Sequence, residues 1–337
     1  MPEENTNQFN SVDNTKLVGN MNRASRNSRL AIIKGMLPKR SARLIAGLSI
    51  LGLVLLVAIF LPLFAKEPNQ ISDIGLTGPS ASHLLGTTKS GQDVLAQLGY
   101  STRGSLIIGF SVGVIALILS TIFGVLGTYI GGWVDETFAL ITNVMLVIPG
   151  LPLTIVIAAM IPNKGTGMLV AVISVTAWAG ASRVLRAQTL SIRGRDYVLA
   201  ARIAGEHPLR VICVEILPNL LPVMASQFTF SVLGAILSES SLSFIGLGSS
   251  SQFSLGTMLF YAQNGSALNA GAWWWFLPPG LMIALVGAGL SFVNFSIDEV
   301  INPHLRNASV KTPKGHKHGR KRTSAPDKTL EGKGGQE

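Results

Sequence analysis

Glu239 is the ionisable side chain that lies deepest inside an apolar run of this sequence, between the hydroxyl groups of Ser238 and Ser240. A charged group is costly in hydrocarbon, so such a residue faces protein or water and usually serves a function. Two roles are open for this group of residues. It can line a polar pathway through a membrane, or it can form a hydrogen bond between helices.

The other reactive side chains do not form an enzyme site. The five histidines are dispersed without zinc-ligand spacing, and Cys213 is the single cysteine, which excludes an intramolecular disulfide. The phosphate-binding pattern Gly-x-x-x-x-Gly-Lys-Ser/Thr does not occur, and no nucleophile stands beside a base in a recognisable motif. We therefore expect no enzymatic activity, no cofactor and no metal in this chain, so any ATP must be bound by separate subunits.

Composition points to a membrane protein, because 48% of the residues are hydrophobic and only 13% are charged, against roughly a quarter in soluble domains. Crossing the hydrocarbon takes a run of about 20 apolar residues. Six runs approach that length, at residues 44–65, 105–130, 138–161, 167–182, 220–248 and 274–297. We predict an all-α membrane protein with six transmembrane helices.

The charge distribution predicts the orientation of these spans. The formal net charge is +10, but all except four of the lysines and arginines fall before residue 44, between 183 and 219, or after 305. Positive residues are retained on the cytoplasmic side of a membrane. We therefore expect both termini in the cytoplasm, as basic disordered tails at 1–39 and 299–337, and membrane lipid rather than nucleic acid as the surrounding partner.

The loop between the fourth and fifth spans reads as two short helices separated by a glycine. Asp196 is expected to cap the first helix, and Gly205 to end it in the left-handed conformation. Pro208 suits the first turn of the second helix, and Pro218 is expected to prevent its continuation.

This loop has the features of a docking element. Its first helix carries Tyr197 and the small residues Ala200, Ala201 and Ala204, so it can enter a groove on a partner. We expect the arginines around it to pair with acidic groups at the rim of that groove. They are Arg193, Arg195, Arg202 and Arg210.

Two further segments are predicted to shape the molecule. Pro149 and Pro152 should kink the third span, either as a hinge or as passive curvature. Residues 67–104 are expected to form an extracytoplasmic segment with an amphipathic surface helix. In that helix Val94, Leu95 and Leu98 would face lipid or neighbouring helices, whereas Gln92, Asp93 and Gln97 would face water.

Four segments of the chain, in order, resemble the C-type permease subunits of dipeptide, oligopeptide and nickel ABC importers. The first runs from His83 to Leu106, with Thr88 at a position where the family has Asp and Gln92 and Gln97 where it has Arg. The second is the EAA loop, in which Ala200, Ala201, Gly205, Leu217 and Pro218 match, while Leu199 replaces Glu and Glu215 replaces Ile. The third is Ala235–Gly248, around Glu239, and the fourth is Ile297–Leu305.

The resemblance implies a type I importer permease fold. A first transmembrane helix at 40–66 would precede a five-helix core at 105–298, with a cytoplasmic coupling loop at 191–219 that includes Tyr197, Ala204, Leu217 and Pro218. The implied location is a prokaryotic plasma membrane. The implied partners are a homologous B-type permease, two cytosolic ATPases that bind ATP and magnesium, and an extracytoplasmic solute-binding protein.

The implied function is half of the translocation pathway of an ATP-driven importer for oligopeptides or dipeptides. Oligosaccharides and nickel chelates are alternative substrates, since nothing in the sequence separates them. An ion-coupled secondary transporter is the alternative class, and the sparse intramembrane charge argues against it.

Overall fold

The structure, a computed structural model, describes residues 42–65, 67–248 and 252–301. This part of the chain consists of helices and connecting segments, and its only β pairing is an isolated bridge between Thr87 and Asp93. The all-α membrane fold predicted from the sequence is confirmed. The tail expected at 1–39 and all but the start of the one expected at 299–337 lie outside the described residues.

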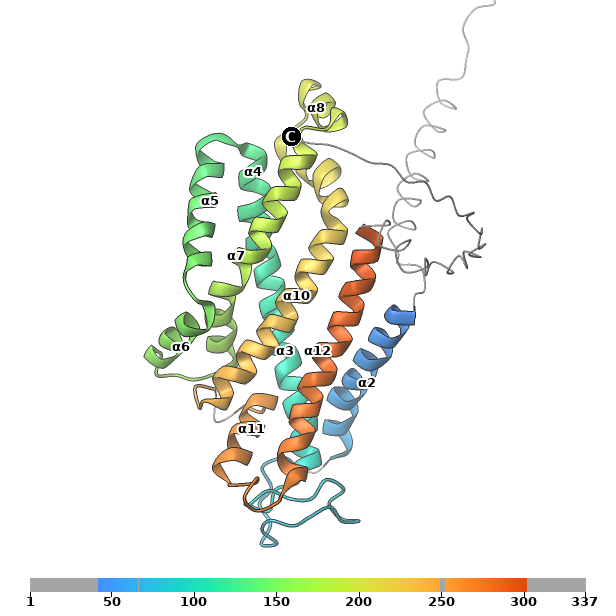
Figure 1. Cartoon of the computed structure of the whole chain (residues 1–337), viewed down its shortest axis with the longest axis vertical. Helices are drawn as coiled ribbons and strands as arrows, with labels where there is room; N and C mark the ends of the chain where they lie inside the picture. The colour runs from blue at the N-terminus through green and yellow to red at the C-terminus, as the bar shows by residue number, and fades with distance from the viewer. Residues whose placement is uncertain (1–41, 66, 249–251, 302–337) are drawn as a thin grey trace, which may run out of the picture. The chain divides into compact units, whose positions relative to one another are not determined.

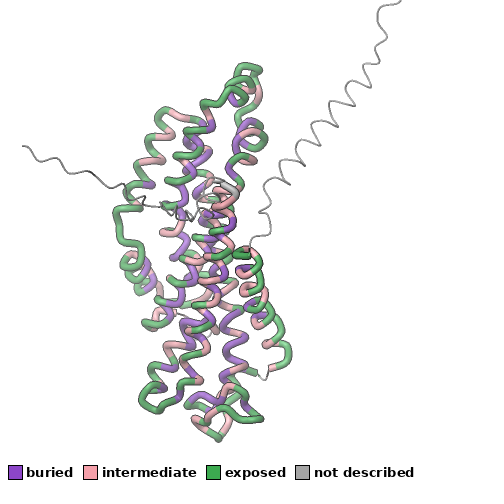
Figure 2. Tube along the Cα trace, turned by 45° about the vertical axis from the view of Figure 1, so that its right-hand side comes forward, coloured by how far each residue is buried: buried purple, intermediate pink, exposed green. Residues whose placement is uncertain are grey.

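Five long helices dominate the structure: α2 (Ala42–Phe64), α3 (Val94–Thr121), α7 (Thr166–Arg193), α10 (Leu217–Phe244) and α12 (Trp273–Ile301). Helix α3 packs against both α7 and α10, and α2 packs against α12 and α3 (Figure 1). Buried residues follow the inner faces of these helices, and exposed residues line their outer faces and both ends (Figure 2). Each of the five long helices is, or is part of, a helix long and apolar enough to cross a membrane.

Two of these helices are extended by π-helical segments. Helix α3 continues through η1 (Ile122–Leu126) into α4 (Gly127–Ile130), and α9 (Pro208–Val211) continues through η2 (Ile212–Ile216) into α10. Each continuous helix has 37 residues, which is about 55 Å at 1.5 Å per residue. Because the hydrocarbon layer is about 30 Å thick, both helices project well beyond it.

Helix α3 begins eleven residues before the predicted core, so the expected surface helix is in fact the start of α3. Val94 and Leu98 are buried in the largest apolar cluster. Gln97, which we expected to face water, is 8% exposed, and its Nε2 donates to Gln92 Oε1 at 2.8 Å. Asp93 caps the helix by accepting from the Ala96 backbone N–H at 3.0 Å, and its other oxygen lies 2.8 Å from His83 Nδ1.

The third predicted span is broken rather than continuous. Helix α5 (Gly132–Val147) and helix α6 (Gly150–Met160) meet at an angle of 86°. The break falls at Ile148, which is extended, and Pro149, because a proline lacks an N–H and disfavours a helical residue before it. Pro152 lies in the first turn of α6, where a missing N–H is tolerated. If α5 and α6 are counted together as one span, the described residues contain six candidate membrane spans.

Helix α11 (Leu255–Asn264) is a short helix between α10 and α12, at the opposite end of the described bundle from α8 (Figure 1). A capping box starts it, since Ser254 accepts from the Thr257 N–H and the Thr257 side chain accepts from the Ser254 N–H. Gly256 lets α11 approach α10 closely, because a Cβ there would lie 2.6 Å from Ser240 Cα.

Candidate functional site

The loop between α7 and α10 projects from one end of the structure and contains α8 (Asp196–Ile203) (Figure 1). Its start differs from the prediction. Arg195 occupies the N-cap position without a side-chain bond, and Asp196 is the first helical residue. A carboxylate in the first turn still favours the helix, because the N-terminus carries partial positive charge.

A Schellman turn ends α8. The Gly205 N–H bonds to the Arg202 carbonyl and the Glu206 N–H to the Ala201 carbonyl, both at 3.1 Å. Gly205 has a φ of +78°, in the left-handed region that favours glycine. A Cβ on Gly205 would meet nothing within 4 Å. Backbone conformation, rather than space, therefore requires a glycine here.

The second short helix does not stop at Pro218. Pro208 opens α9 and His207 Nδ1 accepts from the Leu209 N–H, as a cap. The chain then stays helical through η2, where the Leu217 N–H bonds to Ile212 O, five residues back. The wider π turn accommodates the ring of Pro218 near the start of α10. The prediction that Pro218 ends the helix is therefore wrong.

The predicted docking residues divide into two groups. Tyr197, Ala200, Ala204 and Gly205 are exposed. Ala201 and Leu217 instead pack against an apolar cluster that contains Val125, Leu185, Val198 and Ile216, and Pro218 is half-buried.

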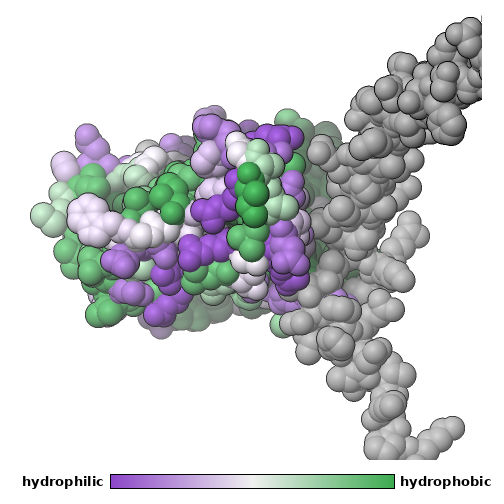
Figure 3. Space-filling view, turned by 90° about the horizontal axis from the view of Figure 1, so that it is seen from above, coloured by the Kyte–Doolittle hydropathy of each residue, from purple (hydrophilic) through white to green (hydrophobic). Residues whose placement is uncertain are grey.

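Val198 holds α8 to the rest of the structure, because its side chain is fully buried in that cluster. The opposite side of α8 is apolar and open, with Leu199 42% and Ile203 88% exposed. Seen from the α8 end, hydrophobic and hydrophilic residues lie next to one another on the surface (Figure 3). The loop thus presents a short helix whose exposed residues are small or apolar, together with the charged Asp196 and Arg202.

Three of the four arginines expected to contact a partner are engaged within the chain. Arg193 Nη1 donates to Thr128 O at 2.7 Å, the Arg202 guanidinium lies 5.1 Å from the centre of the Tyr129 ring, and Arg210 pairs with Glu206. Arg195 is exposed, and among the described residues no bond to its side chain is found.

Sequence reasoning missed an ion pair beside this loop. Arg186 of α7 binds Asp135 of α5 through two bonds, Nε to Oδ1 at 2.8 Å and Nη2 to Oδ2 at 3.0 Å. Thr128 of α4 donates to the same carboxylate at 3.3 Å. The feature of the sequence that could have pointed to this ion pair is Asp135 itself, an acidic residue at the start of a long apolar stretch. Together with Arg193, this pair ties the α4–α5 turn to the end of α7.

Glu239 lies in the contact between α3, α10 and α11 and is fully buried. Its Oε2 accepts from Ser105 Oγ at 3.0 Å and its Oε1 from Ser243 Oγ at 2.7 Å. Ser105 Oγ also accepts from the Leu255 N–H at 3.0 Å, so the chain of bonds reaches α11. Among the described residues Glu239 has no ion-pair partner.

Ser238 lies elsewhere, on a pocket of about 340 Å³ between α6, α7 and α10. The lining mixes polar residues, among them Thr154, Thr176, Gln227 and Ser231, with apolar ones, and the pocket begins beside the break at Pro149. Ser240 is buried, and its hydroxyl has no partner among the described residues. The structure therefore does not bring Ser238, Glu239 and Ser240 into one site.

A second buried polar link, which the sequence did not suggest, joins α10 to α12. Ser226 Oγ donates to Asn294 Oδ1 at 2.7 Å and lies 3.2 Å from Asp298 Oδ1. An asparagine inside the last apolar run was the available signal.

Comparisons with known proteins identify the family to which this sequence is similar. Residues 116–307 match the family described as binding-protein-dependent transport system inner membrane component. The chain is 32% identical over 263 residues to the oligopeptide transport system permease protein OppC of Lactococcus lactis subsp. cremoris, covering 75% of this chain and 89% of the relative. It is 31% identical over 274 residues to the dipeptide transport system permease protein DppC of Bacillus subtilis, covering 80% and 84%. A solved structure of the MetNI methionine ABC transporter in inward-facing conformations shares 17% identity, with a TM-score of 0.49 over 61% of this chain and 95% of that one.

Proposed function

The chain belongs to the family of binding-protein-dependent transport system inner membrane components, and we propose that it is the C-type permease subunit of an ATP-driven importer of oligopeptides or dipeptides. The peptide substrate is inferred from relatives named as oligopeptide and dipeptide permeases. The proposed location is a prokaryotic plasma membrane, with α8 and both termini on the cytoplasmic side.

The observation that carries this proposal is the shape of α8. A helix of eight residues is attached to the body by Val198, ended by a Schellman turn, and open on its outer side. Such a helix fits into a groove on a separate ATPase subunit, which binds ATP and Mg²⁺. Movement of the ATPases is then transmitted through Val198 to the apolar cluster shared by α7, η1 and η2.

The pocket between α6, α7 and α10 supports the assignment of the pathway. Its lining mixes hydroxyl and amide side chains with apolar ones, including Ser238, Ser231 and Gln227. These groups can hydrogen-bond a peptide backbone without a fixed charge. We propose that the pocket is this subunit's half of the translocation pathway, which a homologous B-type permease completes. An extracytoplasmic solute-binding protein delivers the substrate.

Transport assays with the complete importer in proteoliposomes test this function. We expect uptake of a labelled tripeptide to require ATP and solute-binding protein, and to persist when ion gradients are abolished by ionophores. Uptake that follows an ion gradient without ATP would contradict the proposal. A labelled oligosaccharide and a nickel chelate serve as competing substrates, and preference for either would replace the peptide assignment.

Substitution of Gly205 tests the docking role of the loop. Valine at φ +78° is strongly disfavoured, whereas asparagine adopts the left-handed conformation readily. We therefore expect Gly205→Val to insert and assemble but to lose most transport-coupled ATP hydrolysis, and Gly205→Asn to retain it. Equal coupling in both variants would show that the shape of this turn does not matter.

A further inference from the structure

Arg183 is a charged residue inside the stretch of α7 that crosses the membrane. Helix α7 has 28 residues, which is about 42 Å at 1.5 Å per residue. A hydrocarbon layer of about 30 Å leaves about 12 Å of this length to be shared between the two ends of the helix. Arg183 lies ten residues, about 15 Å, before the last residue of α7. It is therefore within the depth of the hydrocarbon wherever along the helix the layer begins.

The Arg183 side chain has little to satisfy it within this chain. It is exposed, and its Nη2 donates to Asn143 Oδ1 of α5 at 3.4 Å, beyond the usual range of about 2.7–3.2 Å. Arg186, one turn further along α7, is instead held by Asp135 through two bonds. Among the described residues no acidic side chain pairs with Arg183. A charge at this depth requires protein or water beside it, and such residues commonly mark a substrate path.

The side of α7 that lines the pocket between α6, α7 and α10 continues to Arg183. Thr176 and Gly180 line that pocket, and residues three or four apart lie on the same side of a helix. Arg183 and Ala187 follow at those spacings toward the α8 end, and both are exposed. An open strip of the helix therefore leads from the pocket, past Arg183, to the end proposed to be cytoplasmic.

Arg183 supplies a charge that the pocket lacks. None of the described residues that line the pocket is charged. A peptide there can bond through its amide groups to Gln227 and Ser231, but its terminal carboxylate finds no cation. On this side of α7, Arg183 is the first cation toward the α8 end. A guanidinium matches a carboxylate with two parallel donors.

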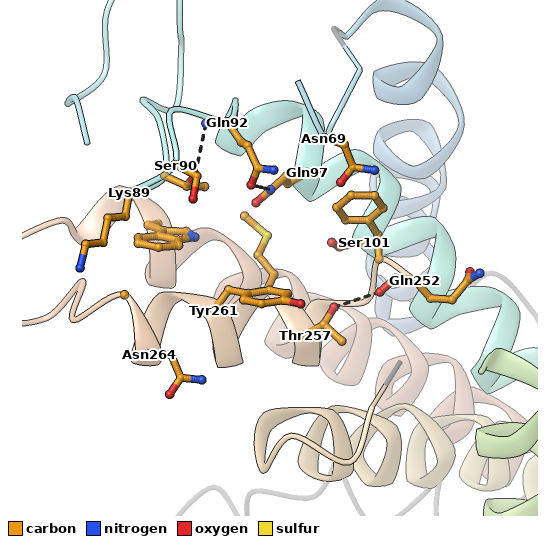
Figure 4. Close-up of a pocket in the computed structure, with 15 residues that line it drawn as sticks. Asn69, Lys89, Ser90, Gln92, Gln97, Ser101, Gln252, Thr257, Tyr261 and Asn264 are labelled. Atoms are coloured by element: carbon orange, nitrogen blue, oxygen red, sulfur yellow. Dashed lines mark hydrogen bonds between the residues drawn. The ribbon is translucent and has the colours of Figure 1, made fainter. Parts of the chain in front are cut away.

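Lys89 is also exposed and cationic, but it lies at the α11 end of the described bundle. It borders a cavity of about 580 Å³ between the segment before α3, helix α11 and the start of α12 (Figure 4). That cavity shares no lining residue with the pocket between α6, α7 and α10. Lys89 is therefore a matched control for Arg183, because it is a cation beside a cavity but outside the proposed pathway.

We propose that Arg183 binds the terminal carboxylate of a peptide that leaves the pathway toward the α8 end. This inference rests on the proposed function and adds a specificity-determining residue to it, so that part of the selection for a free carboxyl terminus takes place in the permease. Asn143 is a positioning residue, since it holds the guanidinium without neutralising it. A carboxylate at this depth needs a counter-charge, whereas an amide does not.

Uptake of a labelled tripeptide and of its C-terminal amide by the complete importer in proteoliposomes tests this contact. Both are measured at saturating solute-binding protein for the wild type, Arg183→Gln, Arg183→Lys and Lys89→Gln. The binding protein is the same in every assay. Its own preference therefore cancels when the acid-to-amide ratio of uptake rates is compared between variants.

We expect Arg183→Gln to lower the acid-to-amide ratio at least about fivefold, through slower uptake of the acid. Arg183→Lys should give an intermediate ratio, because an ammonium group keeps the charge without the two parallel bonds. Lys89→Gln should leave the ratio unchanged. Retained uptake of the amide shows that Arg183→Gln folds and assembles. Equal loss of both uptake rates, an unchanged ratio in Arg183→Gln, or an equal fall in Lys89→Gln overturns the proposal.

A second measurement shows whether Arg183 faces water, and it needs no transport of the amide. In a Cys213→Ser background held in nanodiscs, Ala187→Cys is labelled with an anionic and with a neutral methanethiosulfonate. Additional Arg183→Gln should lower the anionic-to-neutral ratio of labelling rates at least about threefold, because Arg183 attracts the anion. An unchanged ratio, or no labelling, places this side of α7 against lipid or another subunit and overturns the proposal. Tripeptide uptake without ATP in the wild type would contradict the proposed function instead.

Discussion

Single residues in this protein connect helices that are distant in the sequence. Glu239 accepts bonds from serines of its own helix and of α3, and through Ser105 it reaches the first residue of α11. A fully buried carboxyl group is costly unless such bonds compensate it. Its position therefore favours a structural role over a place in the translocation pathway.

Substitution of Glu239 should separate these two roles. Leucine would leave the buried hydroxyls of Ser105 and Ser243 without their acceptor, and we expect the free energy of unfolding to fall by about 1–3 kcal/mol, typical of buried polar groups left unsatisfied. Glutamine can still bond to both serines and should stay close to the wild type. Thermal unfolding of the purified protein in detergent measures both variants.

The Ser105→Ala variant is the control, because it removes one bond and leaves Glu239 in place. It should lose less stability than Glu239→Leu, and the two effects should not add in the double variant. A Glu239→Gln variant that unfolds like the wild type but no longer transports would instead assign Glu239 to the pathway.

The type of a residue was enough to predict the role of some single residues but not the contacts of others. Gly205 was predictable, since a glycine after a short helix indicates a left-handed turn from local chemistry alone. The partners of Arg193, Arg202 and Arg186 were not, because Thr128, Tyr129 and Asp135 lie more than fifty residues away and meet them only through helix packing. Long-range pairing leaves no local signal in one sequence.

At the scale of elements, the α4–α5 turn is fastened to the helices that carry α8. Arg186 holds Asp135 through two bonds, Arg193 holds Thr128 O, and Arg202 of α8 lies over Tyr129. The turn contains two glycines with positive φ, Gly131 and Gly132. These contacts give a route by which movement of α8 reaches α5 and the broken span.

We expect Arg186→Lys to loosen this turn, because an ammonium group cannot reproduce the two parallel bonds of a guanidinium. Hydrogen exchange of the backbone amides at residues 128–136 should become several-fold faster, with little change in α2 or α12. Arg195→Lys is the matched control, since Arg195 is exposed and no bond to it is found in the described chain. Equal exchange in both variants would show that the pair does not fasten the turn.

Prolines show why element bounds were only partly predictable. Pro149 breaks its span by 86°, whereas Pro218 lies in a continuous helix. The residues around Pro149 and those around Pro218 differ little in how strongly they predict a break in the helix. The difference comes from η2, whose wider turn is held by Ile212 and Ile216 in a cluster with residues of η1 and α7. Tertiary packing thus decided an outcome that the local rule for proline left undetermined.

At the scale of the whole molecule, the apolar runs were enough to predict the membrane class. Against the six predicted spans, the described residues hold five helices long and apolar enough to cross, or six if the bent pair of α5 and α6 is one span. The two ends of the described bundle then differ: α8 extends from one, and α11 lies at the other (Figure 1). From the charge distribution we propose that the first end is cytoplasmic and the second lies on the opposite side of the membrane.

Cysteine labelling tests this orientation, since the chain has one native cysteine, Cys213. In a Cys213→Ser background, a cysteine at exposed Ala204 should react with an impermeant maleimide only in inside-out vesicles. A cysteine at exposed Ser90 should react only in right-side-out vesicles or intact spheroplasts. The reverse pattern would invert the topology and remove α8 from the ATPases.

The two π-helical segments also affect where a residue can be inserted into this chain or deleted from it. A π turn holds one residue more than an α turn, so deletion of one residue there restores regular helix and leaves the flanking turns in their original orientation. Elsewhere in a span, deletion of a residue rotates everything beyond it by about 100°. Ile122–Leu126 and Ile212–Ile216 are therefore places where a long helix can gain or lose one residue over evolution while its faces keep their neighbours.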